Sequence, residues 1–329
     1  MKLPRRKFLR AAASTVAGAV ALPALSRIAS ASDYPTRPVR IIVGFAAGGA
    51  PDILARLCGQ WLSERLGQSF VIENRTGAGG NIATEAVVQA PPDGYTLLLA
   101  STGNTVNVTL YNNLNYDFLR DVTPVAGISR EPLAMEVNPS LPVTTVPEFI
   151  AYAKANPGKI NYGSAGIGSS LHMAGELFNL KAGVKLVHVP YRGSPPALTD
   201  LLGGQLQLMF CPLPPSLEYL KSGKLRALAV TTAARSQVLP DIPVIADFVP
   251  GYEASAWYGI GAPAHTPVEI VNRLNAEINA GLADAKLKAQ LTDIGSVPFV
   301  LSPADFGKHL AAETEKWATV IRAANIKAD

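Results

Sequence analysis

The chain has 329 residues, of which 48% are hydrophobic and 16% are charged. This length suffices for two domains, and the composition excludes a disordered chain, which would be less hydrophobic and more charged. The formal net charge of +4 comes from residues 1–32, which carry six basic side chains and no acidic one, whereas the rest of the chain has 23 basic and 25 acidic residues. That balance offers no basic surface for a nucleic acid, so no nucleic-acid partner is expected.

The N-terminus has the pattern of an export signal. Two arginines at residues 5–6 precede an apolar pair, an alanine-rich run covers residues 11–24, and residues 29–31 (Ala-Ser-Ala) have the small side chains of a cleavage site. The arginine pair is similar to that of twin-arginine signals, which predicts a signal peptide over residues 1–31 and a periplasmic protein. An uncleaved membrane anchor is the alternative. No later run has the length and hydropathy of a membrane span, so we expect the mature protein not to be embedded in a membrane.

The first predicted element after this signal is a strand that enters a glycine-rich loop. The apolar residues 39–43 predict the strand, and apolar side chains at three- and four-residue steps from Ile53 to Trp61 predict a helix that ends near Leu66. Residues 44–49 between them contain three glycines, whose backbone can approach a ligand closely. Because the start of a helix offers unpaired N–H groups and a partial positive charge, this stretch favours an anion.

The same order of strand, polar loop and helix recurs along the chain. Strands are predicted at residues 70–73, 95–100, 160–162 and 185–189, and the loops that follow them are residues 74–81, 101–104, 163–170 and 190–194. Each loop leads into a predicted helix. This alternation predicts the α/β class, with doubly wound sheets flanked by helices.

Two crossings of the chain between lobes are predicted. Residues 122–137 are β-like with no helical pattern, and residues 254–260 form a strand that returns to the first lobe. We therefore predict one lobe from residues 32–131 plus 254–329 and a second lobe from residues 132–253, with a cleft between them.

The loops lack the motifs of nucleotide, hydrolase and metal sites. No GxGxxG or Walker lysine follows the first strand, no GxSxG is present, and the four histidines lack metal-ligand spacing, so neither a metal nor a cofactor is expected. Cys58 and Cys211 lie in separate apolar elements, which favours two buried thiols over a disulfide. The loops instead offer backbone N–H groups and hydroxyls where ligands bind in open α/β sheets, beyond the carboxyl ends of the strands.

A series of motifs extends over almost the whole mature chain. In order, they are residues 34–38, 43–49 (VGFAAGG), 73–75 (ENR) with 77–80 (GAGG), 92–97 (PDGYTL), 164–166 with 169–172 (SSLH), 189–193 (VPYRG) and 197–205 (ALTDLLGGQ). Together they resemble the Bug receptors, the solute-binding proteins of tripartite tricarboxylate transporters.

The resemblance implies a two-lobed periplasmic-binding-protein architecture, or Venus flytrap, that closes on a small carboxylate. It implies a monomeric binding protein rather than an enzyme, with a membrane permease as its partner. A ligand sensor that docks on a membrane signalling protein is one alternative, and an exported hydrolase of the α/β type is another.

Carried over residue by residue, the resemblance assigns the ligand contacts. They are Phe45, Ala46, Ala47, Gly48, Asp52, Ser101, Thr102, Asn104, Ser164, Ser169, Ser170, His172, Tyr191, Arg192 and Gly193. Several of these side chains have structural alternatives. Phe45 can belong to the core, Asp52 can cap the first helix, His172 can bind a neighbouring carbonyl, Tyr191 can pack against its helix, and Arg192 can pair with an acid of its own lobe.

One position departs from the pattern of the family. Many members have an Asp after the strand that ends here at Phe210, and in amino-acid binders it meets the ligand ammonium. This chain has Cys211-Pro212 instead. The departure predicts a mono- or dicarboxylate ligand without an amino group.

Overall fold

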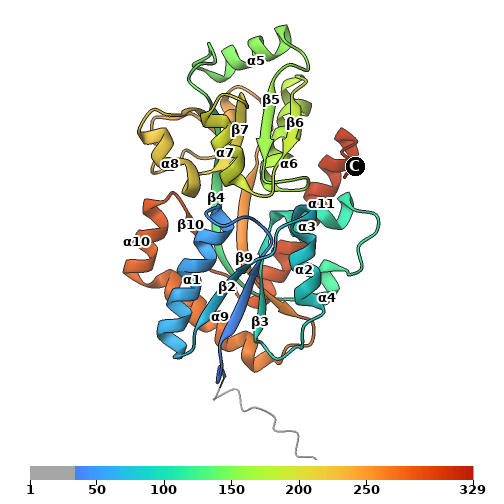
Figure 1. Cartoon of the computed structure of the whole chain (residues 1–329), viewed down its shortest axis with the longest axis vertical. Coiled ribbons are helices and arrows are strands. Elements are labelled where there is room, and N and C mark those ends of the chain that lie inside the picture. Colours follow the sequence, from blue (N-terminus) through green and yellow to red (C-terminus); the bar gives the residue numbers. More distant parts are fainter. Residues whose placement is uncertain (1–33, 329) are drawn as a thin grey trace, which may run out of the picture. The chain divides into compact units, whose positions relative to one another are not determined.

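The first third of the chain repeats a strand followed by a helix (Figure 1). The computed structural model describes residues 34–328, so the predicted signal peptide lies outside the described residues. The elements of this part are β1 (Val39–Val43), α1 (Ala50–Leu66), β2 (Phe70–Asn74), the 3-10 turn η1 (Ala78–Gly80), α2 (Asn81–Val88), β3 (Thr96–Ser101), α3 (Thr102–Leu110) and α4 (Phe118–Asp121).

The rest of the chain contains the longest strand, a second series of strand–helix repeats and three C-terminal helices. The middle elements are β4 (Val122–Val137), α5 (Val146–Ala155), β5 (Asn161–Ser164), α6 (Ser170–Ala182), β6 (Val187–Pro190), α7 (Ser194–Leu202), β7 (Leu208–Pro212), α8 (Leu213–Lys221), β8 (Arg226–Val230) and η2 (Ile245–Asp247). The last ones are β9 (Ser255–Pro263), α9 (Val268–Ala283), α10 (Ala285–Asp293), β10 (Val297–Pro298) and α11 (Pro303–Ala324).

Local sequence signals explain where the helices begin and end. Helix α5 starts at Thr145, whose side chain accepts a hydrogen bond from the N–H of Glu148, and such an N-cap stabilises a helix by about 1 kcal/mol. Helix α11 starts in the same way, at Ser302. Helix α1 ends at Gly67 in the left-handed conformation (φ 72°), which glycine adopts without a steric penalty.

The strands form one sheet in the order β2-β1-β3-β9-β4-β7-β5-β6, and β8 and β10 pair with β4 off this path. At one end β1 is parallel to β2 and β3, and at the other end β5 is parallel to β6 and β7. The two parallel groups are joined by β4 and β9, which pair antiparallel with each other. The α/β class predicted from the sequence is confirmed.

Strand β4 changes its partners about two-thirds of the way along its length. Its residues 122–132 pair with β9, and its residues 133–137 pair with β7. The change falls within two residues of the lobe boundary that the sequence predicts at residue 132. The assignment of residues to two lobes stays a prediction, which this change of partners favours.

Each parallel group has its own apolar core. Near β3 and β9 the core includes Leu98, Trp257 and Phe306, and the Trp257 and Phe306 rings meet edge to face with centroids 5.7 Å apart. Near β7 it includes Met209 and Cys211. Cys58 and Cys211 are both buried free thiols, as predicted.

The sequence interpretation missed three helices, the first of which is the short α4. It ended the strand at Cys211-Pro212 and assigned no helix to the stretch with Pro214 and Pro215, yet α8 begins there, because prolines in the first turn of a helix leave no hydrogen bond unmade. Helix α10 was also missed. Over residues 34–328 the structure contains no helix with the length and apolar character needed to cross a membrane.

Candidate functional site

The loops after β1, β3, β5 and β6 meet around a small cavity, here called the inner cavity. Its volume, measured as the space open to the centre of a water molecule, is about 20 Å³, which is room for about one ordered water. The residues that line it are Phe45, Gly49, Pro51, Ser101, Gly103, Ala165, Ser169, Ser170, Leu171, Ser194, Pro212 and Tyr258. Among these described residues there are hydroxyls and backbone groups but no charged side chain.

The N-termini of α3 and α6 reach the inner cavity from the two parallel groups of strands. In α3 the N–H groups of Thr102 and Gly103 have no acceptor within the helix, and in α6 the same holds for Ser170 and Leu171. Helices α1 and α7 also begin at the cavity, but their prolines in the first turn carry no N–H group. The cavity therefore presents donors and positive dipole ends, the combination that binds an anion.

Hydrogen bonds behind the cavity hold the start of α3 in place. Ser101 and Asn104 form a capping box, in which the Ser101 N–H donates to Asn104 Oδ1 (2.8 Å). Asn104 Nδ2 in turn donates to Thr84 Oγ1 (2.7 Å), and Thr102 Oγ1 accepts from the N–H of Trp257 (3.1 Å). Of the three predicted residues here, Ser101 lines the cavity, while the side chains of Thr102 and Asn104 support it.

The first glycine-rich loop contacts the loop after β6. The Ala46 N–H donates to the carbonyl oxygen of Arg192 (3.1 Å). The preceding residue, Phe45, lines the inner cavity. Gly193 lies so close that a Cβ atom there would be 2.7 Å from the Cβ of Ala46. Ala47 and Gly48, also predicted, are exposed and do not line the inner cavity.

Asp52 organises the first loop from inside helix α1. Its buried carboxylate accepts hydrogen bonds from the Gly48 N–H, from Asn74 Nδ2 and, at two positions, from the Arg56 guanidinium (2.9–3.0 Å). Burial by itself raises the pKa of Asp52, but these hydrogen bonds outweigh burial and lower it. The N-cap residue of α1 is Gly49, so the sequence interpretation of Asp52 as the cap is corrected: Asp52 lies in the first turn and reaches back to the loop.

A second, larger space lies next to the inner cavity and is here called the outer chamber. It has a volume of about 370 Å³ and shares Phe45 and Ala165 with the inner cavity. Its other lining residues are Gly44, Gly77, Ala78, Gly79, Gly80, Tyr111, Gly166, Ile167, Pro190, Tyr191 and Arg192.

Among the described residues that line the outer chamber, the one with a basic side chain is Arg192. The exposed Arg192 side chain makes no ion pair or hydrogen bond with the residues that the structure describes, so its guanidinium is available to a ligand. Tyr191 is engaged, because its hydroxyl donates to Asp200 Oδ2 (2.5 Å). Burial, together with this bond to a carboxylate, raises the pKa of Tyr191 to about 12.

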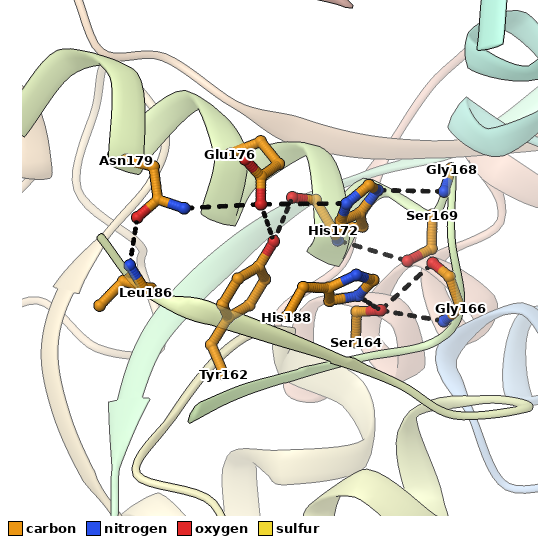
Figure 2. Close-up of polar contacts among 10 residues, drawn as sticks. All are labelled: Tyr162, Ser164, Gly166, Gly168, Ser169, His172, Glu176, Asn179, Leu186 and His188. Atoms are coloured by element: carbon orange, nitrogen blue, oxygen red, sulfur yellow. Dashed lines mark hydrogen bonds and ion pairs between the residues drawn. The ribbon is translucent and has the colours of Figure 1, made fainter. Parts of the chain in front are cut away.

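His172 lies behind the cavity rather than in it (Figure 2). The ring is buried, its Nδ1 accepts from the N–H of Gly168 (3.2 Å), and it stacks on His188. The predicted Ser164 is also buried, and its hydroxyl is 2.6 Å from His188 Nε2. The sequence interpretation did not single out His188. This residue lies on β6, whereas its partners Ser164 and His172 lie on β5 and at the start of α6.

Eight of the residues that line the inner cavity are absent from the ligand contacts that the resemblance assigned: Gly49, Pro51, Gly103, Ala165, Leu171, Ser194, Pro212 and Tyr258. Tyr258 comes from β9, far along the chain, and no local motif marks it. Ser194 carried a weak signal, since it follows the predicted Gly193 directly.

Within residues 34–328, no group of three or more His, Cys, Asp or Glu side chains has an arrangement suited to a metal ion.

Comparison with known proteins agrees on one family. Residues 54–326 match the family described as "Tripartite tricarboxylate transporter family receptor". Protein BugT of Bordetella pertussis is 36% identical over 311 residues, which cover 94% of this chain and 95% of BugT. The solved structure of R. palustris Rpa4515 with adipate is 43% identical, with a TM-score of 0.87 over 89% of this chain and 99% of that chain.

The periplasmic binding protein BugD is a further structural neighbour, at 34% identity and a TM-score of 0.85 over 89% of this chain and 99% of that chain. These likenesses confirm the periplasmic-binding-protein architecture that the sequence predicted. The chain belongs to the Bug receptors, the receptor family of the tripartite tricarboxylate transporters.

Proposed function

We propose that this protein is a periplasmic solute-binding receptor that captures a small organic carboxylate and presents it to a tripartite tricarboxylate-type transporter. The observation that carries the proposal is the meeting of α3 and α6 at the inner cavity, where four N–H groups lack helical acceptors and no described lining residue is charged. A carboxylate group matches these donors in charge. Family membership and the adipate in Rpa4515 support the same ligand class.

The ligand should lack an amino group. An ammonium requires an acid or several acceptors, and the inner cavity offers no acidic side chain. At the position where an acid would lie, Pro212 lines the cavity and Cys211 is buried.

The outer chamber favours a ligand with a second carboxylate. Phe45 and Ala165 border both spaces, so a linear chain can extend past them from the inner cavity toward Arg192. The guanidinium can bind a carboxylate through two parallel hydrogen bonds. We therefore expect a dicarboxylate longer than malate, with adipate as the first probe. The contacts expected from the sequence for Ala47 and Gly48 stay part of this proposal, whereas His172 lines neither space and is not proposed to contact the ligand.

The lobes that close on the ligand would be residues 32–131 plus 254–329 and residues 132–253, with β4 and β9 between them. The backbone bond from Ala46 to Arg192 would then join the two lobes in a closed state. The twin-arginine pattern and the family support export to the periplasm.

Isothermal titration of the purified protein tests the ligand class. The probes are adipate, malate, hexanoate, glutamate and aspartate, and native mass spectrometry of the purified protein shows whether an acid co-purifies. We expect saturable one-to-one binding of adipate in preference to the two amino acids. Binding of glutamate or aspartate alone, or turnover of any probe, would contradict the proposal.

A pair of variants tests the role of the helix start. Ser170 is the first residue of α6, a position where proline is tolerated but carries no N–H donor. Ser170→Pro should weaken adipate binding at least tenfold, because one charge-assisted hydrogen bond is lost. The matched control Ser170→Ala keeps the N–H group and loses only the hydroxyl, so it should bind more tightly than Ser170→Pro. Equal affinities of the two variants would show that the backbone N–H group at position 170 does not bind the ligand.

A further inference from the structure

Three aromatic rings form a stack behind the loop that joins β5 to α6, in which Tyr162 and His172 are buried and His188 is half-buried (Figure 2). The His172 and His188 rings lie 4.0 Å apart between centroids, with an angle of 23° between their planes. The ring of Tyr162 stacks against His188 at 5.0 Å. These rings come from α6, β6 and β5, and neither imidazole lines the inner cavity or the outer chamber.

The two imidazoles hold the loop over residues 164–169 through hydrogen bonds. His188 Nε2 is 2.6 Å from Ser164 Oγ, and that oxygen accepts from the N–H of Gly166 (3.0 Å). His172 Nδ1 accepts from the N–H of Gly168 (3.2 Å). Gly166 and Gly168 have φ angles of 119° and 83°, so these bonds fix the two residues that give the loop its shape.

This loop belongs to both spaces of the candidate site. Ala165 and Ser169 line the inner cavity, and Gly166 and Ile167 line the outer chamber. Gly168 also lies close to helix α3, because a Cβ atom at position 168 would be 2.2 Å from Asn107 Oδ1. A change in the hydrogen bonds of the loop therefore changes the site itself.

We propose that His172 and His188 are positioning residues, and that this loop keeps its ligand-binding conformation only while His172 is neutral, so that carboxylate affinity falls on acidification. The inference rests on the proposed function. It assigns the two histidines a role in affinity without contact with the ligand.

The hydrogen bond from Gly168 requires a neutral His172, whereas His188 Nε2 can donate to Ser164 Oγ or accept from it. A nitrogen that accepts from an N–H carries no proton, so His172 is the Nε2–H tautomer, and a proton added at Nδ1 breaks the bond to Gly168. Burial lowers the pKa of His172 to about 3, with a further contribution from His188, and burial lowers the pKa of His188 to about 4. Two rings 4.0 Å apart also cannot both be charged without strong repulsion.

Within residues 34–328, the acid recorded near the pair is Glu176. Glu176 Oε1 is 4.0 Å from His172 Nε2, and this carboxylate already accepts from the hydroxyl of Tyr162 (2.5 Å). The nearest group of α3 to the loop is the uncharged Asn107. The charge of Glu176 favours a proton on His172, but burial outweighs it in the closed loop, since the pKa of His172 is lowered.

Release of the loop exposes the rings to water and returns their pKa to the ordinary value of about 6.5. Acid then favours the released loop and opposes ligand binding. One imidazole with that pKa weakens binding about tenfold between pH 7.5 and pH 5.5.

The experiment compares variants that keep the hydrogen bonds but do not titrate. His172→Asn places an amide oxygen near the position of Nδ1, and His188→Gln places an amide near the position of Nε2. Adipate affinity is measured by titration calorimetry from pH 8 to pH 5.5 for the wild type and for the double variant, so that protonation of the ligand cancels in the ratio. His265→Asn is the control, because His265 is exposed and lies in a left-handed conformation that Asn tolerates.

We expect the double variant to bind adipate within about threefold of the wild type at pH 7.5 and about tenfold more tightly at pH 5.5. His172→Gln moves the amide away from the position of Nδ1, so it should bind more weakly than His172→Asn at every pH. Parallel pH profiles for the wild type and the double variant would overturn the proposal, because a purely structural role gives no difference in pH dependence.

Nitrogen NMR of the histidines in the wild-type protein is a second test, which does not depend on the folding of a variant. With adipate bound, both rings should stay neutral down to pH 5, and without ligand at least one should titrate near pH 6. Neutral rings down to pH 5 in both states would also overturn the proposal. If no acid of the panel binds at pH 7.5, the proposed function fails instead, and the joint titration of His172 and the Gly168 amide still tests whether a neutral ring holds the loop.

Discussion

The backbone N–H of Ala46 donates to the carbonyl oxygen of Arg192 over 3.1 Å, and so connects the loop after β1 to the loop after β6. The next residue, Gly193, leaves no room for a side chain, because its Cβ atom would be 2.9 Å from the nitrogen of Ala46. The contact between these two loops therefore depends on a glycine at position 193.

Gly193→Ala should weaken adipate binding by about tenfold or more, because the added methyl group separates the two loops. The thermal midpoint of the ligand-free protein should change little. Calorimetry and thermal unfolding check the two expectations, with Gly203→Ala as the control, since a Cβ there meets its nearest neighbour only at 3.4 Å. Unchanged affinity in Gly193→Ala would show that these loops need not touch for binding.

Arg192→Gln should weaken binding of adipate about tenfold and leave the binding of hexanoate nearly unchanged, because only the dicarboxylate reaches the outer chamber with a charged group. Arg322→Gln changes an exposed arginine at the end of α11 and should alter neither affinity. Equal losses for the two ligands in Arg192→Gln would place the guanidinium near the first carboxylate instead.

Asp52→Asn should lower the free energy of unfolding by about 1–3 kcal/mol at pH 7, because the buried carboxylate accepts from Arg56, Gly48 and Asn74. Since the folded protein lowers the pKa of Asp52 below its ordinary value of 3.8, this stabilisation is present at neutral pH and is lost as the pH falls below 3.8. Urea unfolding at pH 7 and at pH 3 measures the difference. The control is Glu64→Gln, an exposed position of the same helix, and equal destabilisation of the two variants would contradict the assignment.

Glu131 on β4 should oppose folding at alkaline pH. Its carboxyl is buried, one oxygen accepts from Ser129 Oγ (2.8 Å), and burial raises its pKa to about 7. A raised pKa stabilises the folded protein below the ordinary pKa of the acid, and this contribution is lost as the pH rises through 7.

Glu131→Gln should therefore increase the free energy of unfolding at pH 8 by on the order of 1–3 kcal/mol and change it little at pH 5. Chemical unfolding at the two pH values tests this, with the exposed Glu253→Gln as the control. A stabilisation that is the same at both pH values would mean that Glu131 does not titrate in this range.

The sequence predicted the repeats and the loops because each depends on neighbours along the chain. The strand at residues 39–43 and the helix that ends at Leu66 follow from apolar spacing and from Gly67. Helix α8 was missed because Pro214 and Pro215 ordinarily signal a loop, and only the structure shows that both lie in the first turn of a helix.

For the site, the sequence predicted which loops take part but not what each side chain contacts. Phe45, Ser101, Ser169 and Ser170 line the inner cavity, as the glycine-rich loops suggested. His188 was missed because it meets Ser164 through the parallel pairing of β5 with β6, and such a register cannot be read from either strand alone.

Strand β4 passes without a break from its pairing with β9 to its pairing with β7, so the two parallel groups of strands are not joined there by a flexible linker. Its register against β9 shifts between Pro124 and Ala126 and again between Gly127 and Ser129. Bulges of this kind increase the local bend and twist of a strand. A movement that widens the inner cavity would have to bend β4, so the ease of ligand entry would depend on the stiffness of a strand that does not itself line that cavity.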